Sequence, residues 1–466
     1  MLIPSPRVAL AALLLGLAPP GPATAAEGVP SPSATAPVAC AGSRECASKL
    51  GYGNVCSDGR CGPYGDRTDL FVALGMSEKE KPPPEPWRLY PAVLPAIGYN
   101  PALGFLIGAV GTFGMYLGSP STTTMSSASA LALLTTQKQL VLQLSTTVLT
   151  ADNDWQLQGD WRWLLYNQDT FGLGTGIPPV QYGFSTNGWG DTAPIPGAQP
   201  MDFNLLRFRQ SALKSVTPNL YLGGGFRYDR YYDIVDLSLD LAADPPVVTS
   251  HYAYSLYYGF DPSAYTVSGV SVDALYDSRD STINSYRGLY GLLSFAVLPT
   301  WLGSSQSSTM ALADLRAYVG LSDEVPRNVL ALWLRVEGVT SGHQPYMALP
   351  SVGWDAKGTT GRGYVQGRLR GTAWIYAEAE WRFRITDNGL FGGALFANAE
   401  TMSRPAVTSP TYGYEQGAEN LFNSVKPAAG FGLRFLMNRE SRTNVRLDFA
   451  WGVDALAIYM GAGEVF

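Results

Sequence analysis

The chain has 466 residues, and its net charge of −6 with no basic stripe argues against nucleic-acid binding. Its mean hydropathy of +0.01 is too low for a protein of this size built from membrane-spanning helices. The abundant glycine (51) and tyrosine (26) are instead typical of turn-rich β proteins.

Residues 1–25 have the pattern of a secretory signal peptide, with Arg7 before a short apolar core and Ala23-Thr24-Ala25 as a cleavage site. The apolar core is too short to span the roughly 30 Å hydrocarbon layer of a membrane. An exported chain with no spanning helix and many amphipathic strands is expected in the bacterial outer membrane. Its N-terminal segment is then expected in the periplasm.

Residues 26–39 consist mainly of Pro, Ser, Ala and Thr, which predicts a disordered lead-in. The segment 40–62 then holds all four cysteines of the chain: Cys40, Cys46, Cys56 and Cys61. It is too small to fold by core burial, so two disulfides are predicted in the oxidising compartment. Three pairings are possible, and a zinc site made by the four thiolates is the alternative. By resemblance to short cysteine-rich knots of secreted proteins, we favour Cys40–Cys56 with Cys46–Cys61.

Residues 63–90 are predicted to form a short helix, followed by a stiff, charged and proline-rich linker. From residue 91 onward the apolar and polar residues alternate almost continuously, which predicts strands. We predict sixteen: 91–99, 104–117, 127–136, 139–150, 155–166, 203–216, 219–232, 266–277, 287–299, 309–321, 328–341, 372–385, 389–402, 425–437, 443–453 and 456–466.

The strand from 372 to 385 illustrates the alternation. Its apolar face includes Trp381 and Phe383, whereas its polar face includes Glu380 and Arg382. In nearly every predicted strand, one face carries large apolar side chains and the other face carries charges of both signs. This arrangement favours a barrel with lipid outside and a wet lumen. Because open sheet edges do not survive in lipid, residues 91–466 are predicted to form one closed, all-β, antiparallel transmembrane barrel.

Connection lengths support this count of strands. The long gaps 167–202, 233–265, 342–371 and 403–424 all connect odd to even strands, whereas short gaps such as 386–388 connect even to odd strands. Short periplasmic turns and long outer loops are the rule for bacterial barrels.

The gap 342–371 contains Gly361 followed by Arg362, Gly363 and Tyr364. Here the chain resembles the BamA/TamA family of outer-membrane barrels (the bacterial surface antigen superfamily). The sixth outer loop of that family returns into the lumen and carries an aliphatic-Arg-Gly-Phe/Tyr motif. Gly361 departs from the aliphatic position. The segments 277–288 and 434–466 also resemble the family, so the likeness covers the whole barrel.

The resemblance implies partners for Arg362, because the family's loop arginine meets acids on the twelfth and thirteenth strands. Glu380 matches the first position, with Glu378 beside it on the predicted lumenal face. The second position is Asn398, an amide that offers a hydrogen bond rather than a charge. A buried arginine needs such partners, since an unpaired charge is costly. Arg362 is therefore expected to pair with Glu380 in the lumen.

Phe466 ends a strand that is expected to pair with residues 91–99. This end resembles the terminal signal that barrel-assembly machinery recognises, and a free strand edge is a natural template for strand addition. The alternative is that Phe466 is an interfacial ring of an aromatic girdle. Both interpretations remain open from the sequence.

The resemblance implies protein or lipid insertion or translocation at the outer membrane. Family members of this kind carry POTRA repeats before the barrel, and residues 26–90 are too few for one, so a barrel-only member is expected. The alternative function is a passive pore or structural barrel. A weak seam between the first and last strands would favour insertion, and Pro91 and Pro95 lack ladder donors there. The expected partners are membrane lipid and the assembly machinery, with clients unknown.

No catalytic residue, metal or cofactor is predicted. The chain has two histidines, His251 and His343, both in predicted loops, and the sequence contains no phosphate loop or metal-spaced cluster. Acids and arginines on the lumenal faces are expected to pair with one another.

Overall fold

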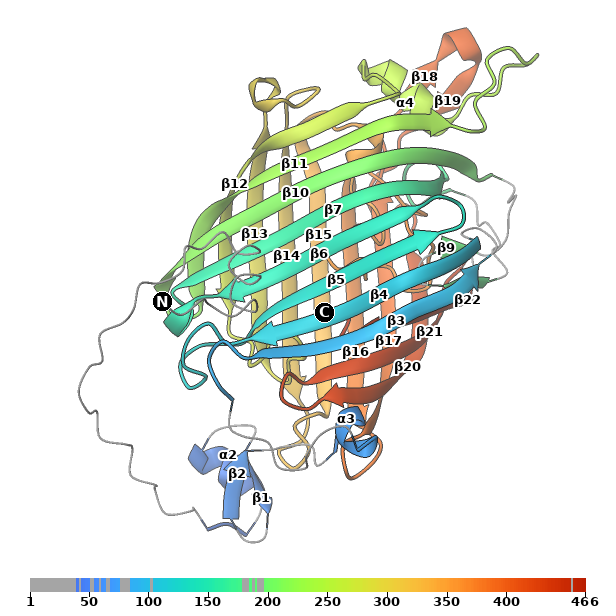
Figure 1. Ribbon diagram of the computed structural model, residues 1–466. Coiled ribbons are helices and arrows are strands. Elements are labelled where there is room, and N and C mark those ends of the chain that lie inside the picture. The colour runs from blue at the N-terminus through green and yellow to red at the C-terminus, as the bar shows by residue number, and fades with distance from the viewer. Residues whose placement is uncertain are drawn as a thin grey trace, which may run out of the picture.

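The computed structural model describes residues 39–41, 43–50, 54–57, 60–63, 68–75, 84–100, 104–177, 184–186, 189–190, 197–453 and 456–466. Figure 1 shows a barrel of tilted strands with a small unit beside one end. Sixteen strands build the wall. They are β3 (Leu89–Asn100), β4 (Gly104–Met115), β5 (Ser126–Thr135), β6 (Leu140–Leu149), β7 (Trp155–Thr170), β10 (Gln199–Thr217), β11 (Leu220–Asp236), β12 (Tyr265–Asp277), β13 (Gly288–Leu298), β14 (Ser308–Gly320), β15 (Val329–Gly342), β16 (Ala373–Arg384), β17 (Phe391–Ser403), β20 (Lys426–Asn438), β21 (Thr443–Trp451) and β22 (Leu456–Ala462).

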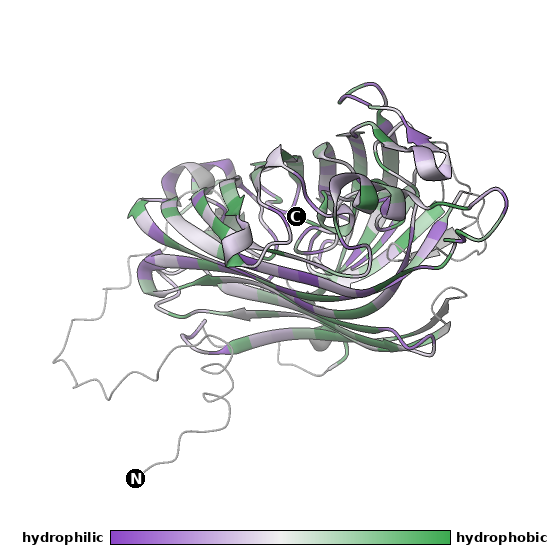
Figure 2. Ribbon diagram, turned by 90° about the horizontal axis from the view of Figure 1, so that it is seen from above, coloured by the Kyte–Doolittle hydropathy of each residue, from purple (hydrophilic) through white to green (hydrophobic). Residues whose placement is uncertain are grey.

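The all-β barrel and its sixteen antiparallel strands are confirmed, and most strand ends differ from the predicted ones by a few residues. The alternation that predicts them is visible in the side chains. On β16, Trp381 is 42% exposed on the outside, whereas the neighbouring Glu380 is fully buried in the lumen. Figure 2 shows this alternation as changing colour along the strands. Among the described residues, no helix is both long and apolar enough to cross a bilayer.

The long connections all leave one end of the barrel, which we call the long-loop end. They carry small elements of their own. These are β8 (Phe184–Thr186), β9 (Trp189–Gly190), α4 (Ser250–Tyr258), η2 (Thr300–Leu302), η3 (Tyr346–Ala348), β18 (Val407–Ser409), η4 (Pro410–Tyr412) and β19 (Tyr414–Gln416), while η1 (Ala151–Asn153) lies in the connection between β6 and β7.

The seam between the first and last strands differs from the rest of the wall. β3 and β22 are neighbours in the sheet order. Every other pair of neighbouring wall strands shares an extended antiparallel register, interrupted by register shifts in three of the pairs, but among the described residues no extended register joins β3 to β22. At its long-loop end, β22 instead pairs in parallel with β8, from Leu456 opposite Phe184 to Ile458 opposite Thr186. The wall is therefore nearly closed, and the described pairing at this seam is less extensive than that between the other neighbouring wall strands.

The prediction that the last strand runs to Phe466 is wrong. β22 ends at Ala462, and Gly463 has φ +83, a conformation that suits glycine. The chain turns there out of the wall and into the lumen, where Phe466 is 2% exposed. An interfacial position for this ring is therefore excluded.

The small unit beside the barrel contains α2 (Ser43–Leu50), β1 (Asn54–Ser57) and β2 (Arg60–Pro63). Its two disulfides join Cys40 to Cys56 and Cys46 to Cys61. The described part of the segment 63–90 includes α3 (Leu70–Ala73), which contacts the end of the barrel opposite the long-loop end, where short turns connect the strands. There the Thr68 amide donates to the Asn388 carbonyl (3.1 Å), and the Arg439 amide donates to Asp69 (3.2 Å). The predicted signal peptide and most of the lead-in and linker lie outside the described residues.

We expect the barrel to fold without this unit, because the described contacts between them are few and lie at the rim. Deletion of residues 26–86 should preserve the heat-modifiable band that marks a folded barrel on a gel. Mass spectrometry of the unreduced full chain should detect no free thiol, since both pairs are bonded. Loss of the folded band in the deletion would contradict the independence of the barrel.

Candidate lumenal site

The connection between β15 and β16 returns into the barrel and occupies its lumen. Its backbone lies close to the wall at Gly363, where φ is +106 and an added Cβ would lie 2.7 Å from the Ala428 Cβ. The Gly363 amide donates to the Tyr459 hydroxyl on β22 (2.9 Å). The neighbouring Tyr364 hydroxyl donates to the Pro427 carbonyl on β20 (2.6 Å). These contacts fix the loop against the strands that close the barrel.

The tip of the loop is held by its own polar groups. Asp355 accepts hydrogen bonds from the backbone amides of Thr359 and Thr360, each at 2.9 Å. The Thr359 hydroxyl in turn donates to the Val465 carbonyl (3.1 Å). The loop tip is thus bonded to the inward-turned end of the chain.

Arg362 lies at the centre of the lumenal site and is 1% exposed. Its Nη2 contacts the carboxylates of Glu378 and Glu380, the latter at 2.6 Å, and its Nη1 lies 3.1 Å from an oxygen of Asp448. The guanidinium carbon also lies 3.4 Å from the centre of the Phe396 ring. Charge-assisted bonds in several directions make this a rigid contact between the loop and two parts of the wall.

A wider network of charges surrounds Arg362. In it, four guanidinium groups meet four carboxylates, and the buried charges are therefore balanced. Its members are Arg362, Arg382, Arg434 and Arg446 with Glu378, Glu380, Asp448 and Glu464. The charge network fits only because residue 432 is a glycine: a Cβ there would lie 2.0 Å from an Asp448 oxygen.

The structure brings most of the sequence-predicted residues together, with one change in role. Arg362 lies beside Glu380 and Glu378. Asn398 contributes its amide as a donor to the Arg362 carbonyl (3.0 Å) and not as an acceptor for the guanidinium. The third carboxylate around Arg362 comes from Asp448, which the motif does not indicate. Asp448 lies on the lumenal face of β21, and the closed barrel brings it to Arg362, Arg434 and Arg446.

The inward-turned end of the chain joins the same region. The Phe466 ring lies 5.0 Å from the Trp333 ring and 6.2 Å from the Tyr318 ring, measured between centroids. Its backbone oxygen accepts a hydrogen bond from Arg382 Nη2 (3.1 Å). Phe466 therefore packs into the lumen beside the charge network.

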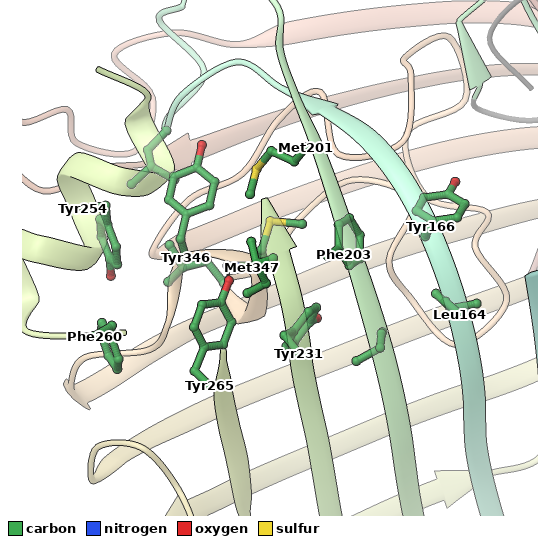
Figure 3. Packing of buried hydrophobic residues seen from close by; sticks show 14 of the residues in the cluster. Leu164, Tyr166, Met201, Phe203, Tyr231, Tyr254, Phe260, Tyr265, Tyr346 and Met347 are labelled. Carbon is green, nitrogen blue, oxygen red and sulfur yellow. Dashed lines mark hydrogen bonds between the residues drawn. The ribbon is translucent and has the colours of Figure 1, made fainter. Parts of the chain in front are cut away.

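An aromatic cluster fills the lumen toward the long-loop end (Figure 3). Tyr346 and Met347 of the loop pack there with Phe203, Tyr231 and Tyr265 of the wall. The Met347 amide donates to the Tyr265 hydroxyl (3.1 Å). The loop is therefore fixed at both its outer and its inner part, and it occupies part of the lumen.

Residues 246–465, which include the loop and the closing strands, match the family model described as the Omp85 superfamily domain. Among solved structures, the chain is similar to BamA from Haemophilus ducreyi lacking POTRA domains 1–3. The identity is 15% and the TM-score 0.44, and the match covers 81% of this chain and 70% of that one. It is also similar to CdiB from Acinetobacter baumannii, at 12% identity and TM-score 0.42, covering 78% of this chain and 56% of that one. No curated protein matches the sequence.

Proposed function

We propose that this chain, whose residues 246–465 match the Omp85 superfamily domain, inserts or translocates proteins or lipids at the bacterial outer membrane. The observation that carries the proposal is the seam. β22 is only seven residues long and ends before the chain turns inward, while β3 has twelve residues. A wall that is weakly joined at one place can open sideways to the bilayer.

The alternative function, a passive pore, is less well supported. A pore needs an open passage, whereas here the loop with Arg362 and the aromatic cluster occupy the lumen. A pore also has no use for a weak seam, since its transport path runs along the barrel axis.

The proposal is tested by joining the seam covalently. Ile97 on β3 and Met460 on β22 both lie on the outer face, 77% and 47% exposed. The double variant Ile97→Cys/Met460→Cys is treated with a bis-maleimide, to which the four bonded native cysteines do not respond. In liposomes, the joined barrel should neither fold an added unfolded outer-membrane protein nor transfer labelled phospholipid between leaflets above the protein-free background.

A matched control joins two strands that are already paired. Leu395 and Phe431 face each other in the register of β17 and β20 and are 47% and 40% exposed. Joining cysteines at these positions should leave both activities unchanged. If the Ile97–Met460 crosslink also leaves them unchanged, or if the barrel only allows small solutes to leak, the pore becomes the better interpretation.

A further inference from the structure

We infer that the connection between β12 and β13, residues 278–287, is a strap that holds the two sides of the seam together at the short-turn end, which lies opposite the long-loop end. The inference rests on the proposed function for the purpose of such a strap, which is to limit how far the seam opens. In the sheet order, six strands lie between β13 and β22 (β14, β15, β16, β17, β20 and β21), and six lie between β12 and β3 (β11, β10, β7, β6, β5 and β4). The strap therefore starts on the side of the barrel that faces the seam across the lumen.

The strap is buried, although connections between strands usually lie at the surface. All residues from 282 to 286 are buried. Ser281 shapes the bend, because its hydroxyl accepts hydrogen bonds from the backbone amides of Ile283 and Asn284, each at 3.2 Å. Its carbonyl accepts a further bond from the Ser285 hydroxyl (2.6 Å). These bonds hold the strap in a compact shape inside the end of the barrel, where it reaches strands on the opposite side.

The first anchor of the strap lies on the β3 side of the seam. The Thr282 hydroxyl donates a hydrogen bond to the carbonyl of Met125, the residue that directly precedes β5 (2.8 Å). Ile283 is 5% exposed and packs in a buried cluster with Met125 and with Tyr90 of β3. A buried hydrogen bond and apolar packing therefore attach this side of the seam to the strap.

The second anchor lies on the β22 side of the seam, at the turn between β20 and β21. The side-chain amide of Asn284 donates to the Arg442 carbonyl (3.2 Å). The Arg442 guanidinium pairs with Asp280 (2.6 Å), and its carbon lies 4.3 Å from the centre of the Tyr286 ring. Tyr286 also belongs to the buried cluster that contains Phe466, in the segment that follows β22. The strap thus contacts both the neighbour of β22 and the cluster around its inward-turned end.

These two anchors join the sides of the seam through a third element. In the described part of the chain β3 and β22 share no extended register, so their own pairing does little to fix the distance between them. A strap that is anchored on both sides does fix it, because one anchor has to break before the sides move apart at this end. Arg442 also has φ +55, a left-handed conformation that is uncommon for residues other than glycine. Such strain persists where the surrounding contacts compensate for it, as the contacts of the second anchor do.

The test measures the distance across the seam in the purified full chain. Val93 on β3 and Met460 on β22 are 45% and 47% exposed on the outer face. The Thr112 hydroxyl donates to the Ala462 carbonyl (3.2 Å), and Thr112 faces Ala92 in the register of β3 and β4. The end of β22 therefore lies near this part of β3. Nitroxide labels on Val93→Cys/Met460→Cys, to which the bonded native cysteines do not react, report the distance by pulsed electron paramagnetic resonance.

Two variants each loosen one anchor. Thr282→Val removes the hydroxyl that bonds to Met125 and keeps the shape of the side chain. Arg442→Gly removes the guanidinium, keeps the carbonyl and suits the positive φ. Each should shift the distances across the seam to longer values and broaden their distribution, and the combined variant should do so more than either. Lys214→Gln breaks the exposed ion pair with Asp154 and should leave the distances unchanged.

A second label pair, Leu395→Cys/Phe431→Cys on the paired strands β17 and β20, should give one unchanged distance in every variant. The heat-modifiable band shows which variants are folded. Wild-type distances across the seam in whichever of Thr282→Val and Arg442→Gly folds would overturn the strap. Loss of the folded band in both would show that these contacts are needed for folding itself, and would overturn it as well. A seam that widens in the variants of a barrel without insertion activity would preserve the strap and contradict the proposed function.

Discussion

Replacing Arg362 with alanine should lower the free energy of unfolding of the barrel by about 3–5 kcal/mol, because it leaves the buried Glu378 without its cationic partner and removes one of the cations that contact Glu380 and Asp448. Glu378 and Glu380 are each at most 4% exposed and Asp448 is fully buried, so water cannot take over the role of the guanidinium. The urea midpoint of unfolding, followed by tryptophan fluorescence in detergent, measures the loss. Arg362→Lys should fall between wild type and alanine, since lysine keeps the charge but lacks the fork geometry.

The control is an exposed ion pair, Lys214 with Asp154, whose side chains are 45% and 52% exposed. Lys214→Ala should cost no more than about 1 kcal/mol. Adding Glu378→Gln to Arg362→Ala should recover part of the loss, because one of the unpaired negative charges is then removed. Equal midpoints for Arg362→Ala and Lys214→Ala would show that the lumenal contact does not stabilise the loop.

The wall of the barrel could be predicted well from the sequence, because the signal for a strand is local. Alternation with period two needs no knowledge of the neighbouring strand, and each strand of the wall has it over most of its length. Loop lengths added an independent check, since long and short connections alternate between the two ends. The prediction that Glu380 pairs with the loop depended on the family motif, which the chain retains at Arg362, Gly363 and Tyr364.

Features that depend on closure could not be predicted in this way. Asp448 reaches Arg362 only because the barrel brings β21 around to the loop, and no local pattern shows that distance. The short strand β8 lies in a long loop, has three residues and pairs in parallel with β22, so it has no alternation to detect. The inward turn at Gly463 interrupts a segment whose alternation continues to suggest a strand, and a single glycine there is a weak signal.

Replacing Phe466 with alanine should destabilise the barrel by about 3–5 kcal/mol, the usual cost of removing a large buried aromatic side chain. The ring is 2% exposed and packs against Trp333 and Tyr318, so its loss leaves a cavity between the loop and β14–β16. Phe422→Ala is the control. Its ring is 68% exposed in a loop, and its removal should change stability by no more than about 0.5 kcal/mol.

Changes at Phe466 also separate its packing in the lumen from the assembly signal that the sequence suggests for this residue. Packing acts on the folded protein, so it should lower the urea midpoint of purified barrel that has been refolded in detergent. A terminal assembly signal acts earlier, so deletion of Phe466 should lower the amount of heat-modifiable barrel in cells without altering secretion across the inner membrane. If refolded Phe466→Ala matches wild type while the cellular amount falls, the ring serves assembly alone. If the cellular amount is also unchanged, Phe466 is dispensable and neither role holds.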